Sequence, residues 1–207
     1  MVAALLAFAL VVALWPRADP TTPGSAGAAR PASSLTSLDA YRARAALQPC
    51  PVGTPPARNP GATAVHGPLS GLVLPCLGQP GTVDVGAALA GRPALLNLWG
   101  PLCQPCAQEL PALAAYAAGP HAIPVLGVEV QRLPEGALEM LAALNVHYPS
   151  FSDPDGRLRA ALDAPAVLPL SFVVSADGRV SQVNPPEVLR SPEQVRAVVA
   201  HYLGPGA

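Results

Sequence analysis

From residue 69 onward, apolar positions follow patterns that predict alternating strands and helices. Residues 94–99 are apolar apart from Asn97, and residues 123–130 form a second mostly apolar run that includes Glu129; both are typical of strands buried on both faces of a sheet. Other stretches place apolar residues at helical spacing. We therefore expect helices at 103–118, 135–144 and 191–203, shorter helical segments at 85–90 and 156–162, and a short strand at 72–74.

A turn signal completes this order of elements. Residues 171–175 and 179–183 flank the segment 176–178, whose glycine supplies the positive φ of a hairpin turn. Asp84 and Ser191 are expected to cap the helices that follow them. Strands that alternate with helices, followed by an antiparallel hairpin and a last helix, predict an α/β fold with a central mixed sheet flanked by helices.

The first fifteen residues, 1–15, are apolar without exception. As a helix they would span about 22 Å, less than the roughly 30 Å of a membrane's hydrocarbon core. No basic residue precedes the run and no small-x-small cleavage site follows it closely, which favours an uncleaved membrane anchor over a cleaved signal peptide. An anchor whose true start lies upstream and a soluble core helix are further alternatives.

The next part of the chain is poor in periodic apolar pattern. Residues 16–31 are rich in Pro, Ala, Gly and Thr and read as a tether. A short helix is expected at 37–48 with Ser37 as its N-cap, and residues 49–68, with six prolines, are expected to form a loop. The predicted organisation is an anchor or signal at 1–15, a Pro/Ala-rich tether and N-terminal extension at 16–68, and one folded domain at 69–207.

Composition excludes several classes of function. The net charge is −1 and only 12% of the residues are charged, so we expect no nucleic-acid partner, which would require a basic face. All twelve basic residues are Arg. Without Lys, the chain has neither a Lys nucleophile nor a P-loop.

The chemistry that the sequence offers lies in its cysteines. Cys103-Gln104-Pro105-Cys106 follows the predicted strand 94–99 and opens a helix. The unpaired N–H groups of a helix start stabilise a thiolate, so we expect Cys103, the exposed cysteine at the cap, to have a lowered pKa. Cys106 lies one turn on, within disulfide reach, and Pro105 fits the first turn. Cys103 can attack a disulfide, and Cys106 can resolve the mixed disulfide.

Other uses of this motif are weighed against the redox one. A zinc site would need a second pair of ligands, but the other cysteines and the four His show no ligand spacing, and haem attachment would need His where Ala107 stands. We therefore expect no metal and no cofactor. A purely structural Cys103–Cys106 disulfide is the remaining alternative.

The other two cysteines, Cys50 and Cys76, lie 26 positions apart, each next to a proline. In an oxidising compartment we expect a structural disulfide that would stabilise the domain by roughly 3–4 kcal/mol. A second redox pair that relays electrons, or two unpaired thiols, are the alternatives.

The segment Asn97-Leu98-Trp99-Gly100-Pro101-Leu102-Cys103-Gln104-Pro105-Cys106, followed by Glu109-Leu110-Pro111, resembles the thioredoxin superfamily. Within it, the sequence is similar to the membrane-tethered TlpA/ResA-like thiol–disulfide oxidoreductases and their actinobacterial relatives. The resemblance covers roughly 69–203 and implies a thioredoxin-like fold. Leu102, where the family usually has Trp, and Leu170, often Thr, depart from the pattern and bear on substrate preference.

The resemblance also implies roles for individual residues. Pro169 matches the cis-proline that faces the dithiol, with Leu168 before it as a contact for the substrate backbone. Trp99 matches the Trp beside the active site, although it could be plain core. Glu109 matches the Glu that tunes the dithiol, although it could be an idle exposed carboxylate. Asn97 stands where cytoplasmic members have a buried acid; it could serve only to satisfy buried backbone groups.

Pro111 and the two residues between the cysteines carry further expectations. Pro111 is expected to interrupt and bend the helix that carries the cysteines. Gln104 and Pro105 place no cationic His beside Cys103, which favours a reductant over an oxidant. Direction of electron flow is otherwise not readable from the chain.

These observations predict a protein thiol–disulfide oxidoreductase that reduces protein disulfides, for example in cytochrome c maturation. The alternatives are a disulfide-forming oxidase of secreted proteins and a non-catalytic membrane-tethered binding protein. The expected partners are protein thiols or disulfides and a membrane redox partner.

The expected location rests on two opposed signals. By the positive-inside rule, Arg17 favours a cytoplasmic C-terminal part. Cysteines outside the C-x-x-C motif favour export, and we give them more weight. We expect a single-pass protein of the cell membrane with its domain on the extracytoplasmic side, or a secreted protein after signal cleavage.

Overall fold

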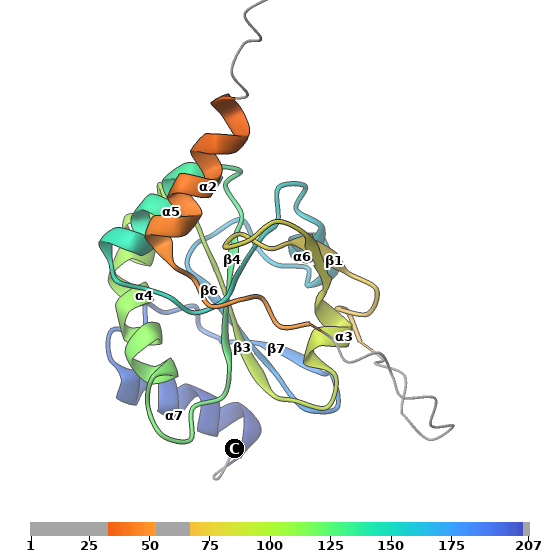
Figure 1. The fold of residues 1–207 in the computed structure, drawn as a ribbon. Coiled ribbons are helices and arrows are strands. Elements are labelled where there is room, and N and C mark those ends of the chain that lie inside the picture. The colour runs from red at the N-terminus through yellow and green to blue at the C-terminus, as the bar shows by residue number, and fades with distance from the viewer. Residues whose placement is uncertain (1–32, 53–66, 205–207) are drawn as a thin grey trace, which may run out of the picture. The chain divides into compact units, whose positions relative to one another are not determined.

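The computed structural model describes residues 33–52 and 67–204, which, apart from Ser33, lie in one compact unit spanning 34–207 (Figure 1). Its centre is a five-stranded sheet of order β5-β4-β3-β6-β7. The strands are β3 Ala94–Trp99, β4 Val125–Glu129, β5 Ser150–Ser152, β6 Leu170–Val174 and β7 Val180–Gln182. Because β3 pairs parallel with β4 and antiparallel with β6, the sheet is mixed, as predicted.

Helices cover both faces of this sheet, with α4, α5 and α7 on one side and α3 and α6 on the other (Figure 1). Their bounds are α2 Ser33–Ala45, α3 Val85–Leu89, α4 Gln104–Ala117, α5 Pro134–Ala143, α6 Arg157–Ala161 and α7 Pro192–Leu203. A two-stranded antiparallel hairpin, β1 Val73–Pro75 and β2 Thr82–Asp84, packs on the α3 side. This is the predicted thioredoxin-like α/β fold; the predicted apolar helix at 1–15 lies outside the described residues.

The sequence of the central strand β3 is apolar apart from Asn97 because the strand is buried on both faces. Successive side chains of a strand point to opposite faces. Leu95 and Trp99 accordingly enter the core beneath α4, while Leu96 and Leu98 enter the core beneath α3, and all four are fully buried. Asn97 shares the α4 side, since it alternates with the same two residues.

Several local predictions are confirmed. The Asp84 carboxylate accepts a hydrogen bond from the Ala87 amide at 2.9 Å, and Ser191 accepts one from Gln194, so both residues cap helices as expected. Gly178 has a φ of 86° in the β6–β7 turn. By contrast, the expectation that Pro111 interrupts this helix is wrong, because α4 runs from Gln104 to Ala117 without a break.

Other details differ from the prediction. The strands β2 and β5 were not predicted, because each contains only one apolar residue, Val83 or Phe151, between polar ones. Helix α2 begins at Ser33, so Ser37 lies inside it and is not its N-cap. The Asn184–Pro185 bond is a second cis peptide bond that no sequence pattern indicated.

Part of the predicted N-terminal extension packs on the domain. Ala45, the last residue of α2, is fully buried in the core beneath α4 and α5. The Gln48 amide donates to the carbonyl of His147 at 2.7 Å, and the Arg42 guanidinium donates to that of Leu77 at 3.2 Å. Within the described ranges, no helix is both long enough and apolar enough to span a membrane.

The segment after α2 is also joined covalently to the domain. Cys50 and Cys76 form a disulfide, with Cα atoms 6.1 Å apart, and both are almost fully buried in the core on the α3 side. Cys76 directly follows β1 and forms a bridge with Phe151 of β5. The bond therefore fastens the N-terminal segment to the edge of the sheet, remote in the chain from Cys103.

Replacing both Cys50 and Cys76 by Ala is expected to lower the free energy of unfolding by about 3–4 kcal/mol, because the open chain regains the entropy of a 26-residue loop. Urea titration measures the change. The matched control is the double replacement of Cys103 and Cys106, which opens a loop of only a few residues and should cost about 2 kcal/mol. A smaller loss for the Cys50/Cys76 variant than for the control would contradict this structural role.

Candidate active site

The cysteine pair lies just after the central strand, at the start of a helix. Strand β3 ends at Trp99, and α4 begins at Gln104 with Cys103 as its N-cap. Cys103 and Cys106 form a disulfide with Cα atoms 5.2 Å apart. Cys103 keeps 8% of its surface exposed and Cys106 none, so solvent reaches the pair only from the Cys103 side. The predicted location at the helix start is confirmed, although Cys103 is less exposed than expected.

The first turn of α4 directs one backbone N–H group at the sulfur of Cys103. The Cys106 amide donates to Cys103 Sγ at 3.2 Å. Pro105 occupies the first turn, where its missing N–H leaves no bond unmade, and both Gln104 and Pro105 are exposed. An N-cap sulfur that accepts from an amide at the positive end of a helix dipole is stabilised as a thiolate once the disulfide is reduced.

The loop before β6 lies at the same end of the sheet. The Leu168–Pro169 peptide bond is cis, the conformation that the resemblance implied. Leu98 of β3 pairs with Leu170 of β6, so the antiparallel register brings Pro169 level with the end of β3, where the cysteine turn begins. Pro169 is buried and Leu168 is half-buried against both cores.

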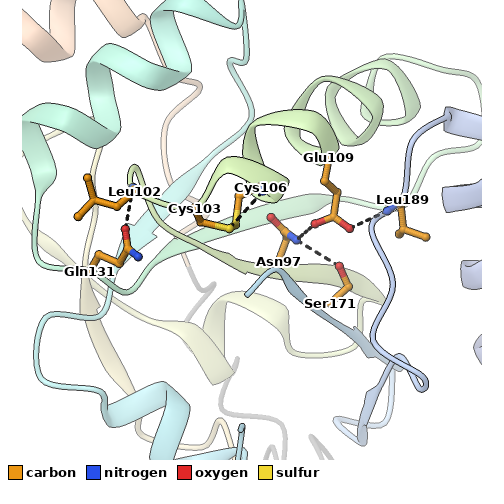
Figure 2. Close-up of a disulfide and its surroundings, with 8 residues drawn as sticks. All are labelled: Asn97, Leu102, Cys103, Cys106, Glu109, Gln131, Ser171 and Leu189. Carbon is orange, nitrogen blue, oxygen red and sulfur yellow. Dashed lines mark hydrogen bonds between the residues drawn. A yellow bond between two sulfur atoms is a disulfide. The ribbon is translucent and has the colours of Figure 1, made fainter. Parts of the chain in front are cut away.

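A buried carboxyl group lies behind the cysteines. Glu109, on α4, is 1% exposed, so it is not the idle surface carboxylate that was one alternative. Its Oε2 accepts from Asn97 Nδ2 at 2.7 Å and its Oε1 accepts from the Leu189 amide at 3.0 Å (Figure 2). Burial raises the pKa of Glu109 to about 7, although both hydrogen bonds favour the ionised form.

Asn97 links this carboxyl group to the neighbouring strand. Its Nδ2 also donates to Ser171 Oγ at 3.2 Å, and Asn97 itself is fully buried (Figure 2). The alternative that Asn97 serves backbone groups is therefore wrong, because its bonds go to side chains. Sequence reasoning missed Ser171 and Leu189; the cross-strand pairing of Asn97 with Ser171 was the available signal for the first, and nothing local indicated the second.

Trp99 belongs to the core rather than to the rim of the site. It has no exposed surface and packs in the same cluster as Cys103 and Cys106. A residue with no exposed surface cannot offer a direct contact to a docking protein. Any influence on the dithiol therefore acts through packing behind it.

The turn that precedes Cys103 is supported by a contact that the sequence did not predict. The Leu102 amide donates to Gln131 Oε1 at 2.8 Å, and the Gln131 amide donates to the buried carboxylate of Glu129 at 2.6 Å. Gly100 makes this approach possible, because a Cβ there would lie 2.3 Å from Gln131 Cδ. The loop after β4 thus supports the turn that carries Cys103.

Two exposed apolar side chains lie in the segments that carry Cys103 and the cis-proline. Leu102 is 76% exposed and Val167, in the loop before the cis-proline, is 51% exposed. Among residues 38–52 and 67–204, no three His, Cys, Asp or Glu side chains are grouped as metal ligands would be. The arrangement offers sulfur chemistry beside an apolar rim.

Comparison with known proteins places this site in context. The Soluble secreted antigen MPT53 of Mycobacterium tuberculosis is 32% identical over 116 residues, which make up 56% of this chain and 66% of that protein. The Thiol:disulfide interchange protein DsbE of Xylella fastidiosa is 33% identical over 115 residues, 55% of this chain and 57% of that protein. The chain thus spans just under two thirds of the length of MPT53 and little more than half of the length of DsbE.

A solved structure shares the fold. The crystal structure of a secreted Mycobacterium tuberculosis disulfide oxidoreductase, described as homologous to E. coli DsbE, superposes with a TM-score of 0.57. It is 28% identical in sequence, and the match covers 65% of this chain and 97% of that one.

The family model described as Redoxin matches residues 61–199, more than half of the 207 residues. The match includes the cysteine turn, the cis-proline loop and the buried carboxyl group. It agrees with the resemblance to the thioredoxin superfamily that the motif around Cys103 carries. The chain belongs to the Redoxin family.

Proposed function

We propose that the chain is an extracytoplasmic protein thiol–disulfide oxidoreductase that works through Cys103 and Cys106. The observation that carries this proposal is the position of Cys103 as N-cap of α4, where it accepts the Cys106 amide at 3.2 Å and is the only one of the pair with exposed surface. The printed name of the DsbE relative, a thiol:disulfide interchange protein, supports the same chemistry.

The exchange runs in two displacements. The Cys103 thiolate attacks one sulfur of a client disulfide, so a Cys103–client bond forms and the other client sulfur leaves as a thiolate that takes a proton from solvent. The Cys106 thiol then loses its proton and attacks Cys103. The Cys103–Cys106 disulfide forms, the second client thiol is released with a proton, and the client has gained two electrons.

A client approaches the dithiol on the apolar rim. Leu102, next to Cys103 in the chain, and Val167, in the loop before the cis-proline, are exposed, and that loop with Leu168 and Pro169 offers backbone groups for strand-like pairing with an extended segment. The preferred client is therefore a protein segment with apolar residues next to its cysteines.

The direction proposed is reduction. Gln104 and Pro105 place no cation beside Cys103, and cationic neighbours are what stabilise the thiolate of strong oxidants. Reduction of haem-binding thiols during cytochrome c maturation is one task of this kind. The same two displacements in reverse would make an oxidase of secreted proteins, and the redox potential separates the two.

The proposed location is outside the cytoplasm. A buried Cys50–Cys76 disulfide suits an oxidising compartment, and the MPT53 relative is named a soluble secreted antigen. The apolar run 1–15 would hold the domain at the cell membrane, next to a membrane redox partner that returns electrons to the dithiol. A cleaved signal would instead release the domain.

Glu109 is proposed to tune the dithiol. Its pKa is raised to about 7 by burial, and Asn97, which donates to it, lies between it and the cysteines (Figure 2). A proton held there at pH 7 weakens the negative field behind Cys106. The carboxyl group therefore gives the resolving step a dependence on pH near 7.

The proposed activity predicts that the wild-type chain reduces insulin disulfides and that Cys103→Ser abolishes this. Cys106→Ser should instead trap a mixed disulfide, visible as a higher-mass adduct on a non-reducing gel. Equilibration with glutathione should give a potential below about −200 mV. A potential near about −120 mV would overturn the reductase assignment, and equal activity for Cys103→Ser and wild type would leave a binding protein instead.

The burial of Glu109 predicts a stability that depends on pH. Because its pKa rises from 4.5 to about 7 on folding, the folded state binds the proton more tightly, so the contribution of Glu109 to stability is fully present below pH 4.5 and is lost as pH rises through about 7. The loss is on the order of 3 kcal/mol for this shift. Urea unfolding at several pH values measures it. Glu109→Gln, which mimics the protonated form, should remove this part of the loss; an unchanged profile would contradict the assignment.

A further inference from the structure

One buried polar atom behind the disulfide has no partner. Asn97 is fully buried, and its Nδ2 group uses its two N–H donors on Glu109 Oε2 and Ser171 Oγ. This fixes the amide so that Oδ1 points the other way, toward the disulfide (Figure 2). No group within the described parts of the chain donates a hydrogen bond to Oδ1.

An unpartnered buried carbonyl is costly. Leaving such an acceptor without a donor costs about 1–3 kcal/mol, and a folded protein retains one only where something compensates. The sulfur of Cys106 is equally buried, and in the disulfide it carries no hydrogen. Reduction of the disulfide by two electrons and two protons gives Cys106 an S–H group, which is a donor.

We propose that in the reduced protein the Cys106 thiol donates a hydrogen bond to Asn97 Oδ1, which makes Asn97 a positioning residue for the resolving cysteine. This inference rests on the proposed thiol–disulfide exchange and adds a part to it. The bond holds Cys106 as a thiol and aims its hydrogen away from Cys103. When Cys106 attacks the mixed disulfide, the bond breaks, and the proton leaves with the released client thiol.

Glu109 strengthens the arrangement from the other side. Its Oε2 accepts a hydrogen bond from Asn97 Nδ2 at 2.7 Å, and hydrogen bonds on the two ends of one amide polarise each other. Asn97 thus lies between the carboxyl group and the sulfur, in contact with the first and facing the second (Figure 2).

The bond exists only in the reduced state, so it shifts the equilibrium toward the dithiol. Removing the carbonyl with Asn97→Leu should favour the disulfide by about threefold to tenfold in equilibrium with glutathione, as the loss of one hydrogen bond implies. A tenfold change corresponds to about 30 mV for this two-electron couple.

A second buried donor supplies the control. Trp99 Nε1 also lacks a partner within the described residues, and it points toward Gly127, where a Cβ would lie 2.8 Å away. If Trp99 or a group bonded to it were the hydrogen-bond partner of Asn97 Oδ1, Trp99→Phe would shift the dithiol–disulfide equilibrium as Asn97→Leu does. We expect Trp99→Phe to leave the bond to Cys106 intact.

Raman spectroscopy of the S–H stretch tests the bond directly. In Cys103→Ser, with Cys50 and Cys76 bonded to each other, Cys106 is the one free thiol of the four cysteines. Its band should lie at the low frequency of a hydrogen-bonded thiol, move up when Asn97→Leu is added, and stay low when Asn97→Asp, which keeps an acceptor, or Trp99→Phe is added. A band at the non-bonded frequency in Cys103→Ser itself, or one that Asn97→Leu does not move, would overturn the inference.

The outcomes remain distinct from those of the proposed function. If Asn97→Leu does not fold, the band is measured in Cys103→Ala, which leaves no acceptor at position 103: a hydrogen-bonded band there supports the bond to Asn97 and a non-bonded band overturns it. The Raman band reports the bond without turnover, so a wild-type chain that fails to reduce insulin would contradict the proposed exchange and leave the bond in place. An active chain whose thiol band is non-bonded would contradict only the bond.

Discussion

The whole site depends on the hydrogen bond from one amide of the first turn of α4 to the sulfur of its N-cap residue, Cys103. Backbone N–H groups at a helix start have no partners within the helix, and here the Cys106 amide finds one in Cys103 Sγ at 3.2 Å. A sulfur so placed is stabilised when it becomes negative, and it is the sulfur of the pair that solvent can reach. Chemistry at Cys103 follows from where the chain turns rather than from any charged neighbour.

The surrounding fold keeps that turn in place. A fully buried strand, β3, fixes one end of it, and the β3–β6 pairing brings the cis-proline loop alongside. From the other side, Gln131 holds the Leu102 amide at 2.8 Å, with the side chain of Gln131 lying over Gly100. Beneath the turn, Asn97 and Glu109 form a small polar group within an otherwise apolar core. The N-terminal segment is attached separately, by Cys50 and Cys76, at the sheet edge.

The features predicted correctly from the sequence are those that local residue patterns determine. The apolar run of β3, the caps at Asp84 and Ser191, and the position of the cysteines at a helix start all depend on a few adjacent residues, and the structure has each of them. The strands β2 and β5 were missed because each has a single apolar residue between polar ones, which gives no strand pattern. The start of α2 was misplaced because Ser37 is a good cap residue in a chain that offers an earlier start.

The site beyond the cysteines could not be read in this way. The bond from Leu189 to Glu109 joins residues 80 positions apart, and the bond from Leu102 to Gln131 joins residues 29 apart. Such contacts depend on how the elements pack, so no local pattern encodes them. Burial likewise decided two of the residues with open alternatives: Trp99 proved to be core, and Glu109 proved to be buried and bonded.

The most direct test of the account is the pKa of the Cys103 thiol in the reduced protein, measured from the pH dependence of its alkylation rate with Cys106→Ser as the background. The account predicts a pKa clearly below the roughly 8.5 of a free cysteine, near about 7 or lower. A value at or above about 8.5 would mean that the amides of α4 do not stabilise the thiolate, and would contradict the central claim.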